Sequence, residues 1–406
     1  MNEVEFKGFS ELLKFVLENP HSDFYRKKYQ NAGFNSLEDF KNPVDVAKIP
    51  FLTKKELSET NPEERFYYPF DSLWQVFSTS GSSFEKPAII YRRQSRRQID
   101  RNNRKNAKKL LFLYSPSRVR VFNVESATVL LVGDLSNLEA TAYQAAMMNV
   151  DSIYSYPSLL INFSSILAKY FDLTNIKFIL CGGEMMTESK INLLRSLFPS
   201  ATIESRYSSV EAGLIGYSCS DANAKPNTYH LYSNVYAEKL GEGGELVISH
   251  LNRYANFGTP LIRYKLGDSI EFFSGGCSCL RKGKLFRVIG RLNQDFIKVG
   301  GGMILASNLE DVLKDIKGVK DFLLHVTEVL KQDKLLPSLL LEIVADGKSE
   351  VSSFIVKEIL NSRLKVGART FLGEAVDKGY FLPLEIRITD EIKRSGHKKT
   401  YISNSF

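Results

Sequence analysis

The middle of the chain alternates short apolar runs with helix-like stretches, and this alternation constrains the fold more than any other feature of the sequence. Strands are predicted at Ala127–Gly133, Ser152–Tyr156 and Lys177–Gly183, and helices at Leu138–Met148, Ser158–Phe171 and Thr187–Leu197. A chain that alternates strand and helix builds a mainly parallel sheet with helices on its faces. The sequence therefore predicts an α/β fold.

The chain on either side of this region has different patterns. A helix capped by Ser10 is predicted to end near Pro20. Beyond Glu211 the sequence turns to short strands and turns, which predicts a β-rich portion. Its strands are predicted at Glu245–Ser249, Leu261–Tyr264 and Leu285–Ile289.

After Arg291 the chain has its own order of strand, helix, strand, strand, helix and strand. A change of pattern is typical of a domain boundary, and we expect a hinge within Leu292–Asp295. The sequence predicts a large N-terminal domain over residues 1–291, with the parallel sheet and the β-rich portion. A small, mobile α+β C-terminal domain is predicted over residues 292–406. The length of 406 residues suits two or three domains.

The composition, with 43% hydrophobic and 25% charged residues, is that of an ordinary soluble globular protein. No run approaches the roughly 18 apolar residues of a membrane-spanning helix. The N-terminus lacks the basic segment and apolar core of a secretory signal. We therefore expect a cytoplasmic protein with no membrane partner. The oligomeric state is left open, with a homodimer as one option.

The net charge of +8 is concentrated in the segment Arg92–Lys109, where only Asp100 is acidic. On a helix, its basic residues would form one stripe because several are three or four apart. One interpretation is a solvated helix face, and the other is a docking site for a phosphate-rich ligand or an acidic carrier protein. A nucleic-acid-binding protein is a further class, but no zinc-finger, RNP or helix-turn-helix pattern supports it.

The segment Ser78–Pro87 (STSGSSFEKP) surrounds one glycine with hydroxyl side chains. Hydroxyls and exposed backbone N–H groups suit a loop that wraps phosphate oxygens, although a polar surface turn has a similar composition. The Walker A pattern GxxxxGK[ST] is absent from the sequence. The candidate binding residues are Thr79, Ser80, Gly81, Ser82 and Ser83.

Two further motifs follow strand-like runs. Gly182-Gly183-Glu184 ends a predicted strand, at the place where open α/β sheets bind nucleotides, although a tight turn also needs glycine. In the segment Tyr207-Ser208-Ser209-Val210-Glu211, the tyrosine can stack on a base and the carboxylate can hold magnesium.

Three motifs lie nearer the C-terminus. Asp268 stands beside a tight turn and can bind ribose hydroxyls. Arg291 precedes the predicted hinge, and the triplet Gly300-Gly301-Gly302 favours motion or the close approach of a ligand. The segment Lys393–Lys399 is a basic loop, for which a frayed terminus is the alternative.

A Cys₃His set offers metal-ligand side chains at Cys219, His230, Cys277 and Cys279. The CxC spacing of its last two members is tighter than the CxxC of most zinc sites. The alternatives are a structural zinc site and small buried thiols in a reducing cytosol. The other cysteine and most other histidines are expected in the core or on the surface: Cys181, His21, His250 and His325.

Taken together and in this order, the motifs resemble those of the adenylate-forming superfamily, which includes acyl-CoA synthetases, adenylation domains and luciferases. The phenylacetate–CoA ligase branch is the most similar. The resemblance rests on Ile49–Leu57 (IPFLTKKEL), Thr79–Ser83 (TSGSS), Gly182–Glu184 (GGE), Tyr207–Glu211 (YSSVE), Asp268, Gly290-Arg291, and Arg394-Ser395 with Lys398. It extends over nearly the whole chain.

The resemblance implies that ATP activates a carboxylic acid, aryl or arylacetic by analogy, and that the acyl group passes to coenzyme A. It implies catalytic roles for Lys398, on the carboxylate and α-phosphate, and for Glu211, on magnesium. Nucleotide binding is implied for the phosphate loop, Gly182, Gly183, Glu184, Tyr207, Ser208, Ser209, Asp268 and Arg291. Gly300, Gly301 and Gly302 match the loop that lines the thiol tunnel after the C-terminal domain rotates. Some members of the branch hold zinc at a CxC before the GR motif, which favours zinc at the Cys₃His set.

The sequence departs from the family pattern at Phe84, Ser208 and His397. Three alternatives therefore stay open: transfer to a carrier-protein pantetheine, transfer to an amine, and a degenerate, non-catalytic ATP-binding homologue. The acid pocket is expected between the 127–160 region and the 182–213 motifs. Tyr154, Tyr156 and Leu214 are its candidate residues.

Overall fold

The computed structural model describes the chain apart from residues 35, 80–85, 94–108, 115–128, 220–225, 252–256, 274–276, 280, 282, 293–295, 301, 333, 347–350, 368–369, 393–401 and 405–406. The chain divides into two compact units. The first comprises Met1–Gly81, Glu85–Lys105 and Glu204–Leu292, and the second comprises Ser82–Phe84, Asn106–Ile203 and Asn293–Phe406. The predicted domains 1–291 and 292–406 divide the chain differently and remain a prediction.

The first unit opens with helices, and the first of these begins earlier than predicted. The helices are α1 (Glu3–Leu17), α2 (Phe24–Gln30) and α3 (Lys54–Glu59), with short 3₁₀ turns at Leu37–Asp39, Pro43–Lys48 and Phe70–Ser72. Asn2 and Glu5 form a capping box, in which each side chain accepts the other residue's backbone N–H. Ser10, the predicted cap, lies inside α1 and donates to the Phe6 carbonyl. The predicted start was wrong because the earlier pair already satisfies the first N–H groups of the helix.

Antiparallel strands form the rest of the first unit. Strand β1 (Leu73–Ser78) pairs with β2 (Ile89–Arg93). A larger sheet has the order β10 (Val235–Leu240), β11 (Glu245–His250), β12 (Tyr264–Phe272), β13 (Leu285–Arg291), β9 (Thr228–Leu231), β8 (Gly213–Tyr217) and β7 (Thr202–Ser209). Neighbours in this order are antiparallel. The predicted β-rich portion is therefore confirmed.

One predicted strand is displaced along the chain. The strand expected at Leu261–Tyr264 begins only at Tyr264, where β12 starts. Arg263 has a positive φ of 48°, which an extended strand does not contain. Its guanidinium is held by the Glu238 carboxylate at 2.9 Å and by the Ile49 carbonyl at 2.6 Å. These contacts hold the backbone in a bend just before the strand.

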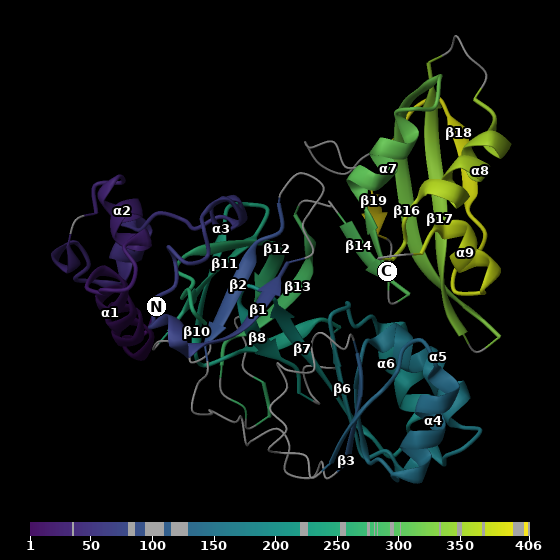
Figure 1. Cartoon of the computed structure of the whole chain (residues 1–406), viewed down its shortest axis with the longest axis horizontal. Coiled ribbons are helices and arrows are strands. Elements are labelled where there is room, and N and C mark those ends of the chain that lie inside the picture. The colour runs from purple at the N-terminus through teal and green to yellow at the C-terminus, as the bar shows by residue number, and fades with distance from the viewer. Residues whose placement is uncertain are drawn as a thin grey trace. The chain divides into compact units, whose positions relative to one another are not determined.

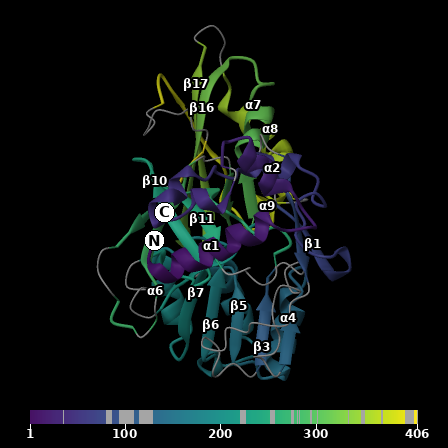
Figure 2. The same cartoon turned by 90° about the vertical axis from the view of Figure 1, so that its left-hand side faces the viewer.

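The predicted alternation of strands and helices is found in the second unit. Strands β6 (Phe178–Gly182), β5 (Ser152–Ser155), β3 (Lys109–Leu113) and β4 (Val129–Val132) are parallel neighbours in that order. Figure 2 shows β6, β5 and β3 side by side. Helices α4 (Leu138–Met147), α5 (Pro157–Leu167) and α6 (Glu188–Leu197) lie together along one side of these strands (Figure 1). A 3₁₀ turn at Leu173–Asn175 precedes β6.

Apolar residues on both faces of the parallel strands are buried. Leu111, Ile153 and Ile179 pack with the helices, and Phe112 and Leu180 belong to a smaller cluster. Burial on both faces is the reason these strands read as nearly continuous apolar runs in the sequence. The parallel sheet is confirmed in this unit, and the chain as a whole is mixed α/β because the first unit is antiparallel.

The C-terminal part of the second unit contains both strands and helices. Its elements are β14 (Phe296–Val299), β15 (Gly302–Leu305), α7 (Ala306–Leu313), β16 (Val319–Lys331), β17 (Lys334–Ala345), α8 (Ser353–Arg363), α9 (Leu372–Asp377), β18 (Glu385–Thr389) and β19 (Ile402–Asn404). The long strands β16 and β17 run side by side in Figure 1, with α8 and α9 next to them. The sheet order is β18-β17-β16-β19. Among the described helices of the chain, none is long and apolar enough to cross a membrane.

Candidate functional site

Tyr207, Asp268 and Arg291 form one hydrogen-bonded network in the first unit. The Tyr207 hydroxyl donates to Asp268 Oδ2 at 2.5 Å, and Arg291 Nε lies 2.9 Å from Asp268 Oδ1. Asp268 on β12 and Arg291 at the end of β13 are direct partners in the strand register. Tyr207 and Arg291, which the sequence placed in separate motifs, therefore both contact the Asp268 carboxylate.

The network fixes the orientation of the Asp268 carboxylate. Burial, together with the Asp268 charge, raises the pKa of Tyr207 well above its ordinary value, so the phenol remains a proton donor. Arg291 Nη1 also donates to the Leu266 carbonyl at 3.0 Å, beside Gly267, whose φ of +81° favours glycine. A carboxylate oxygen accepts more than one hydrogen bond, so this fixed carboxylate can also receive hydroxyl groups.

Glu211 lies in the tight turn that joins β7 to β8. The turn comprises Val210, Glu211 and Ala212, and the Ala212 N–H donates to Ser209 Oγ at 3.0 Å. Ser208 pairs with Leu214 across the two strands. The Glu211 side chain is half-buried, so its carboxylate can meet a ligand at the surface.

Thr79 closes the base of the predicted phosphate loop. Its backbone N–H donates to the Ala88 carbonyl at 3.0 Å, and its hydroxyl accepts the Ala88 N–H at 2.9 Å. These bonds extend the pairing of β1 with β2 by one step. The other loop residues, Ser80, Gly81, Ser82, Ser83 and Phe84, lie outside the described part of the chain.

The predicted basic stripe is not helical at its two ends. Arg92 and Arg93 belong to β2, and Lys109 belongs to β3. Arg92 is only 8% exposed, so it is not part of a solvated face. The spacing would have formed one stripe only on a helix, and these residues are in strands, because strand pairing overrides the local spacing. Residues 94–108 lie outside the described part of the chain.

The Gly182–Glu184 motif lies at the carboxyl end of β6 in the second unit. Gly183 has a φ of +82°, and a Cβ there would lie 2.1 Å from the Tyr114 hydroxyl and 2.7 Å from Tyr156 Cε1. Tyr114 stacks on Tyr156, with ring centroids 3.8 Å apart, and on Tyr154 at 5.1 Å. Glycine at position 183 therefore makes room for stacked tyrosines, two of which the sequence proposed for the acid pocket.

The Glu184 carboxylate is buried among protein partners. It accepts hydrogen bonds from the Ser158 hydroxyl at 2.6 Å and 2.8 Å and lies 3.7 Å from Lys190 Nζ. Ser158 is at the start of α5 and Lys190 is in α6, so the carboxylate connects the two helices. Glu184 therefore has a structural role, which the sequence motif did not reveal.

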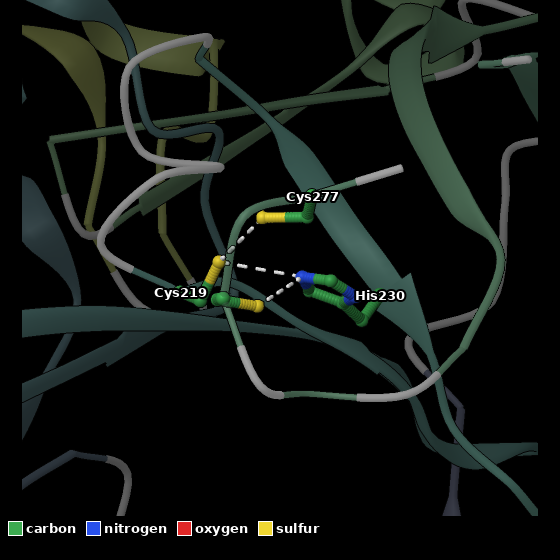
Figure 3. A group of neighbouring side chains, drawn as sticks. Cys219, His230 and Cys277 are labelled. Atoms are coloured by element: carbon green, nitrogen blue, oxygen red, sulfur yellow. Dashed lines mark hydrogen bonds between the residues drawn. The ribbon is translucent and has the colours of Figure 1, made fainter. Parts of the chain in front are cut away.

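The Cys₃His residues come together in the first unit, as Figure 3 shows for Cys219, His230 and Cys277. The Cys219 sulfur lies 3.3 Å from His230 Nε2 and 3.5 Å from the Cys277 sulfur. The Cys279 sulfur lies 3.2 Å from the same imidazole nitrogen. Pairing of β13 with β9 and of β9 with β8 brings these distant segments together.

The cluster fits a tetrahedral zinc ion. All four ligand atoms lie within 4.8 Å of one another. Ligands around zinc, at about 2.3 Å for sulfur and about 2.0 Å for nitrogen, are roughly 3.5–3.8 Å apart. Burial lowers the pKa of His230, which favours the neutral imidazole that binds metals. Cys181 is buried in β6, away from this group in sequence, and is a core residue as predicted.

Comparison with known proteins identifies the fold. No family model matches the sequence. Phenylacetate-coenzyme A ligase of Escherichia coli (strain K12) is 28% identical over 83 residues, which are 20% of this chain and only 18% of that protein. A crystal structure of 2-hydroxyisobutyryl-CoA ligase with 2-HIB-AMP and CoA, in the thioesterification state, aligns with a TM-score of 0.68 and 16% identity. That alignment covers 98% of this chain and 88% of the other. The chain has the fold of this CoA ligase.

A second solved structure has the same fold and a different activity in its name. The amide bond synthetase McbA from Marinactinospora thermotolerans aligns with a TM-score of 0.52 and 14% identity. The alignment covers 83% of this chain and 70% of the synthetase. The fold of this chain is therefore similar both to that of a CoA ligase and to that of an amide bond synthetase.

The remaining predicted residues of the adenylate-forming motifs lie in the second unit. Gly300, with a φ of +57°, turns the chain between β14 and β15. Gly302 lies against the Val366 carbonyl, which a Cβ would approach to 2.0 Å. Glycine is therefore required at position 302 because the backbone there packs too closely for a Cβ atom. Gly301, Lys398 and the neighbouring Arg394, Ser395 and His397 lie outside the described part of the chain.

Proposed function

We propose that the protein activates a carboxylic acid with ATP to an acyl-adenylate and then transfers the acyl group to coenzyme A. The observation that carries this proposal is the Tyr207–Asp268–Arg291 network within an adenylate-forming fold. A fixed, buried carboxylate is the group that a site for vicinal ribose hydroxyls needs. The acid is proposed to be aryl or arylacetic, by analogy with the phenylacetate-coenzyme A ligase match.

In the first step, a carboxylate oxygen of the acid attacks the α-phosphorus of ATP, and the bond to the β-phosphate oxygen breaks. Pyrophosphate leaves with the electron pair of that bond. In this proposal Asp268 holds the ribose, Arg291 lies near the ribose and phosphate, and Tyr207 lies against adenine. Lys398 neutralises charge between the carboxylate and the α-phosphate. Such chemistry needs positioning and charge neutralisation more than bond-making by the protein.

Glu211 is the proposed magnesium ligand. A single carboxylate together with substrate phosphates is the usual protein site for this ion. Its half-buried position on a short turn fits that donor set. When bound, magnesium would neutralise charge on the phosphates. The hydroxyl-rich loop that starts at Thr79 is proposed to hold the β- and γ-phosphates.

In the second step, the sulfur of coenzyme A attacks the carbonyl carbon of the adenylate after losing its proton. The bond between that carbon and the phosphate oxygen breaks, and AMP leaves. Gly300–Gly302 is the proposed thiol-tunnel loop. An amine as acceptor is the second candidate, since the fold is shared with an amide bond synthetase.

Zinc at Cys219, His230, Cys277 and Cys279 is proposed to be structural. Four protein ligands leave no open position for a substrate, which is typical of a structural site. The ion would tie the segment before β13 to β8 and β9.

The test is acid-dependent exchange of labelled pyrophosphate into ATP, with pools of aryl, arylacetic, fatty and amino acids. The proposal expects exchange with one acid class and its loss in Lys398→Ala. The active acid is then offered with coenzyme A, a phosphopantetheinylated carrier protein or an amine. Thioester formation with coenzyme A supports the proposal, and amide formation supports the second candidate. ATP binding without exchange for any pool would instead favour a non-catalytic homologue.

A further inference from the structure

The turn that carries Glu211 is held from both sides by buried side chains of other elements. Arg92 Nη2 donates to the Val210 carbonyl at 2.7 Å, and His250 Nε2 lies 3.1 Å from the Ala212 carbonyl. These carbonyls belong to the residues immediately before and after Glu211. Arg92 is 8% exposed and His250 is fully buried.

The direction of the His250 hydrogen bond follows from its second contact. The Leu261 backbone N–H donates to His250 Nδ1 at 3.1 Å. Because Nδ1 accepts, the ring proton is on Nε2, and Nε2 donates to the Ala212 carbonyl. The tautomer is thus fixed by the backbone, and the turn receives one donor on each side of Glu211.

Phe257 joins the two donors into one assembly. The Arg92 guanidinium carbon lies 3.5 Å from the centroid of the Phe257 ring, and the His250 ring centroid lies 4.6 Å from it. Arg92 and Phe257 also form a backbone bridge, and the Gly258 N–H donates to the Tyr91 carbonyl at 2.9 Å. The assembly of Arg92, Phe257 and His250, which we name the turn clamp, draws on β2, β11 and the segment before β12.

Burying the charged Arg92 guanidinium costs desolvation free energy, which an apolar side chain of similar size would avoid. Packing alone therefore does not account for an arginine at this position. Here its charge is directed to an aromatic face and to a carbonyl that flanks Glu211. Since a short turn has few bonds of its own, two external donors would hold the backbone of residue 211 in one conformation. A metal ligand benefits from this because its carboxylate must be in place before the metal and phosphates arrive.

We propose that Arg92 and His250 are positioning residues that preorganise Glu211 for binding magnesium together with ATP. The inference rests on the proposed function, in which Glu211 is the magnesium ligand. In this proposal they act through the Val210 and Ala212 carbonyls and not as ligands of the metal or the nucleotide.

The test measures metal binding separately from catalysis. Free Mn²⁺ is followed by electron paramagnetic resonance as the full-length protein is added with and without ATP. For Arg92→Met, the affinity for Mn²⁺ in the presence of ATP is expected to fall about tenfold, the scale of one buried hydrogen bond. ATP affinity in the presence of chelator is expected to stay unchanged. His250→Leu, which removes the other donor, is expected to weaken Mn²⁺ binding in the same way. Arg92→Lys and His250→Gln each keep a donor near the carbonyl, so each is expected to bind Mn²⁺ more tightly than Arg92→Met and His250→Leu, respectively.

Arg65→Met is the matched control. Arg65 is also buried and also donates to backbone carbonyls, those of Leu57 at 3.0 Å and of Ile89, and to the Thr259 hydroxyl. None of these described hydrogen bonds of its guanidinium goes to the Glu211 turn. Its loss is expected to lower thermal stability without changing Mn²⁺ affinity. Equal loss of Mn²⁺ affinity in Arg65→Met and Arg92→Met would overturn the inference in favour of general destabilisation.

The outcomes also separate this inference from the proposed function. If Glu211→Gln abolishes Mn²⁺ binding with ATP while Arg92→Met and His250→Leu bind normally, the clamp has no positioning role and the function stands. If the native protein binds no Mn²⁺ with ATP, the magnesium role of Glu211 fails and the inference fails with it.

Discussion

At the scale of residues, the candidate site depends on contacts between side chains that are far apart in sequence. Tyr207 and Asp268 are 61 positions apart, and Arg92 and Val210 are 118 positions apart. The sequence singled out Asp268 and Arg291 through their motifs, but it did not show that they share an ion pair. The spacing alone places Arg92 in a basic stripe, because no local pattern distinguishes a buried arginine from a solvated one.

The Asp268 network gives the first prediction. Asp268→Asn keeps the size of the side chain but removes the charge, and pyrophosphate exchange is expected to fall by about 10²–10³. Tyr207→Phe should cost less, because Arg291 still holds the carboxylate. Glu271→Gln, an exposed change on the same strand, is the control. If Asp268→Asn exchanges as fast as the native protein, the ribose role of Asp268 is wrong.

His250 gives a prediction on pH and stability. Burial lowers the pKa of His250 from 6.5 to about 3, so the folded protein keeps it neutral where the unfolded chain binds a proton. As pH falls from about 6.5 towards 3, protonation of His250 stabilises the unfolded chain but not the folded protein. The free energy of unfolding therefore falls by roughly 1 kcal/mol per pH unit.

Urea unfolding at pH 7 and pH 5 measures this effect in the native protein and in His250→Gln. The native protein is expected to lose more stability between the two pH values than the variant, since glutamine does not titrate. Identical losses in both proteins would show that His250 is not held neutral by burial.

At the scale of elements, the sequence predicted the strands and helices of residues 129–197 to within a few positions. Their apolar runs and caps are local signals, as in α6, where Thr187 caps the helix. The errors came from interactions that a local pattern does not contain. The Asn2–Glu5 capping box moved the start of α1, and the positive φ of Arg263 delayed β12. The Cys₃His set was predicted, but only pairing of β8, β9 and β13 brings its members together.

Metal removal tests that cluster. The native protein is expected to contain one zinc ion per chain by elemental analysis, and its removal by a chelator should lower the melting temperature. Cys277→Ser should lose the ion, since three ligands remain. Metal release is expected to destabilise the fold by several kcal/mol, because zinc binding and folding are coupled.

Cys181→Ala is the control, because Cys181 is a buried cysteine of β6 and not a member of the group. It should keep the zinc. A native protein that binds no zinc, or a Cys277→Ser variant with unchanged zinc content, would contradict the structural zinc site and favour buried thiols.

At the scale of the whole molecule, the resemblance seen in the sequence and the likeness of the fold agree. The shared fold extends over 98% of the chain in the alignment with 2-hydroxyisobutyryl-CoA ligase, at only 16% identity. Fold alone does not determine the acid or the acceptor, since related folds host different chemistry. The first unit carries the Asp268 network, the Glu211 turn and the Cys₃His cluster, and it therefore holds most of the described residues on which the proposed function depends.

The central claim is that the acid's oxygen becomes bonded to the α-phosphorus of ATP. Incubation with an acid labelled with ¹⁸O in its carboxylate, followed by mass spectrometry of the products, measures this most directly. The account predicts AMP that carries one ¹⁸O atom, together with unlabelled pyrophosphate, and no labelled AMP from Lys398→Ala. Formation of ADP with the label in inorganic phosphate would contradict it, because that pattern belongs to attack on the γ-phosphorus.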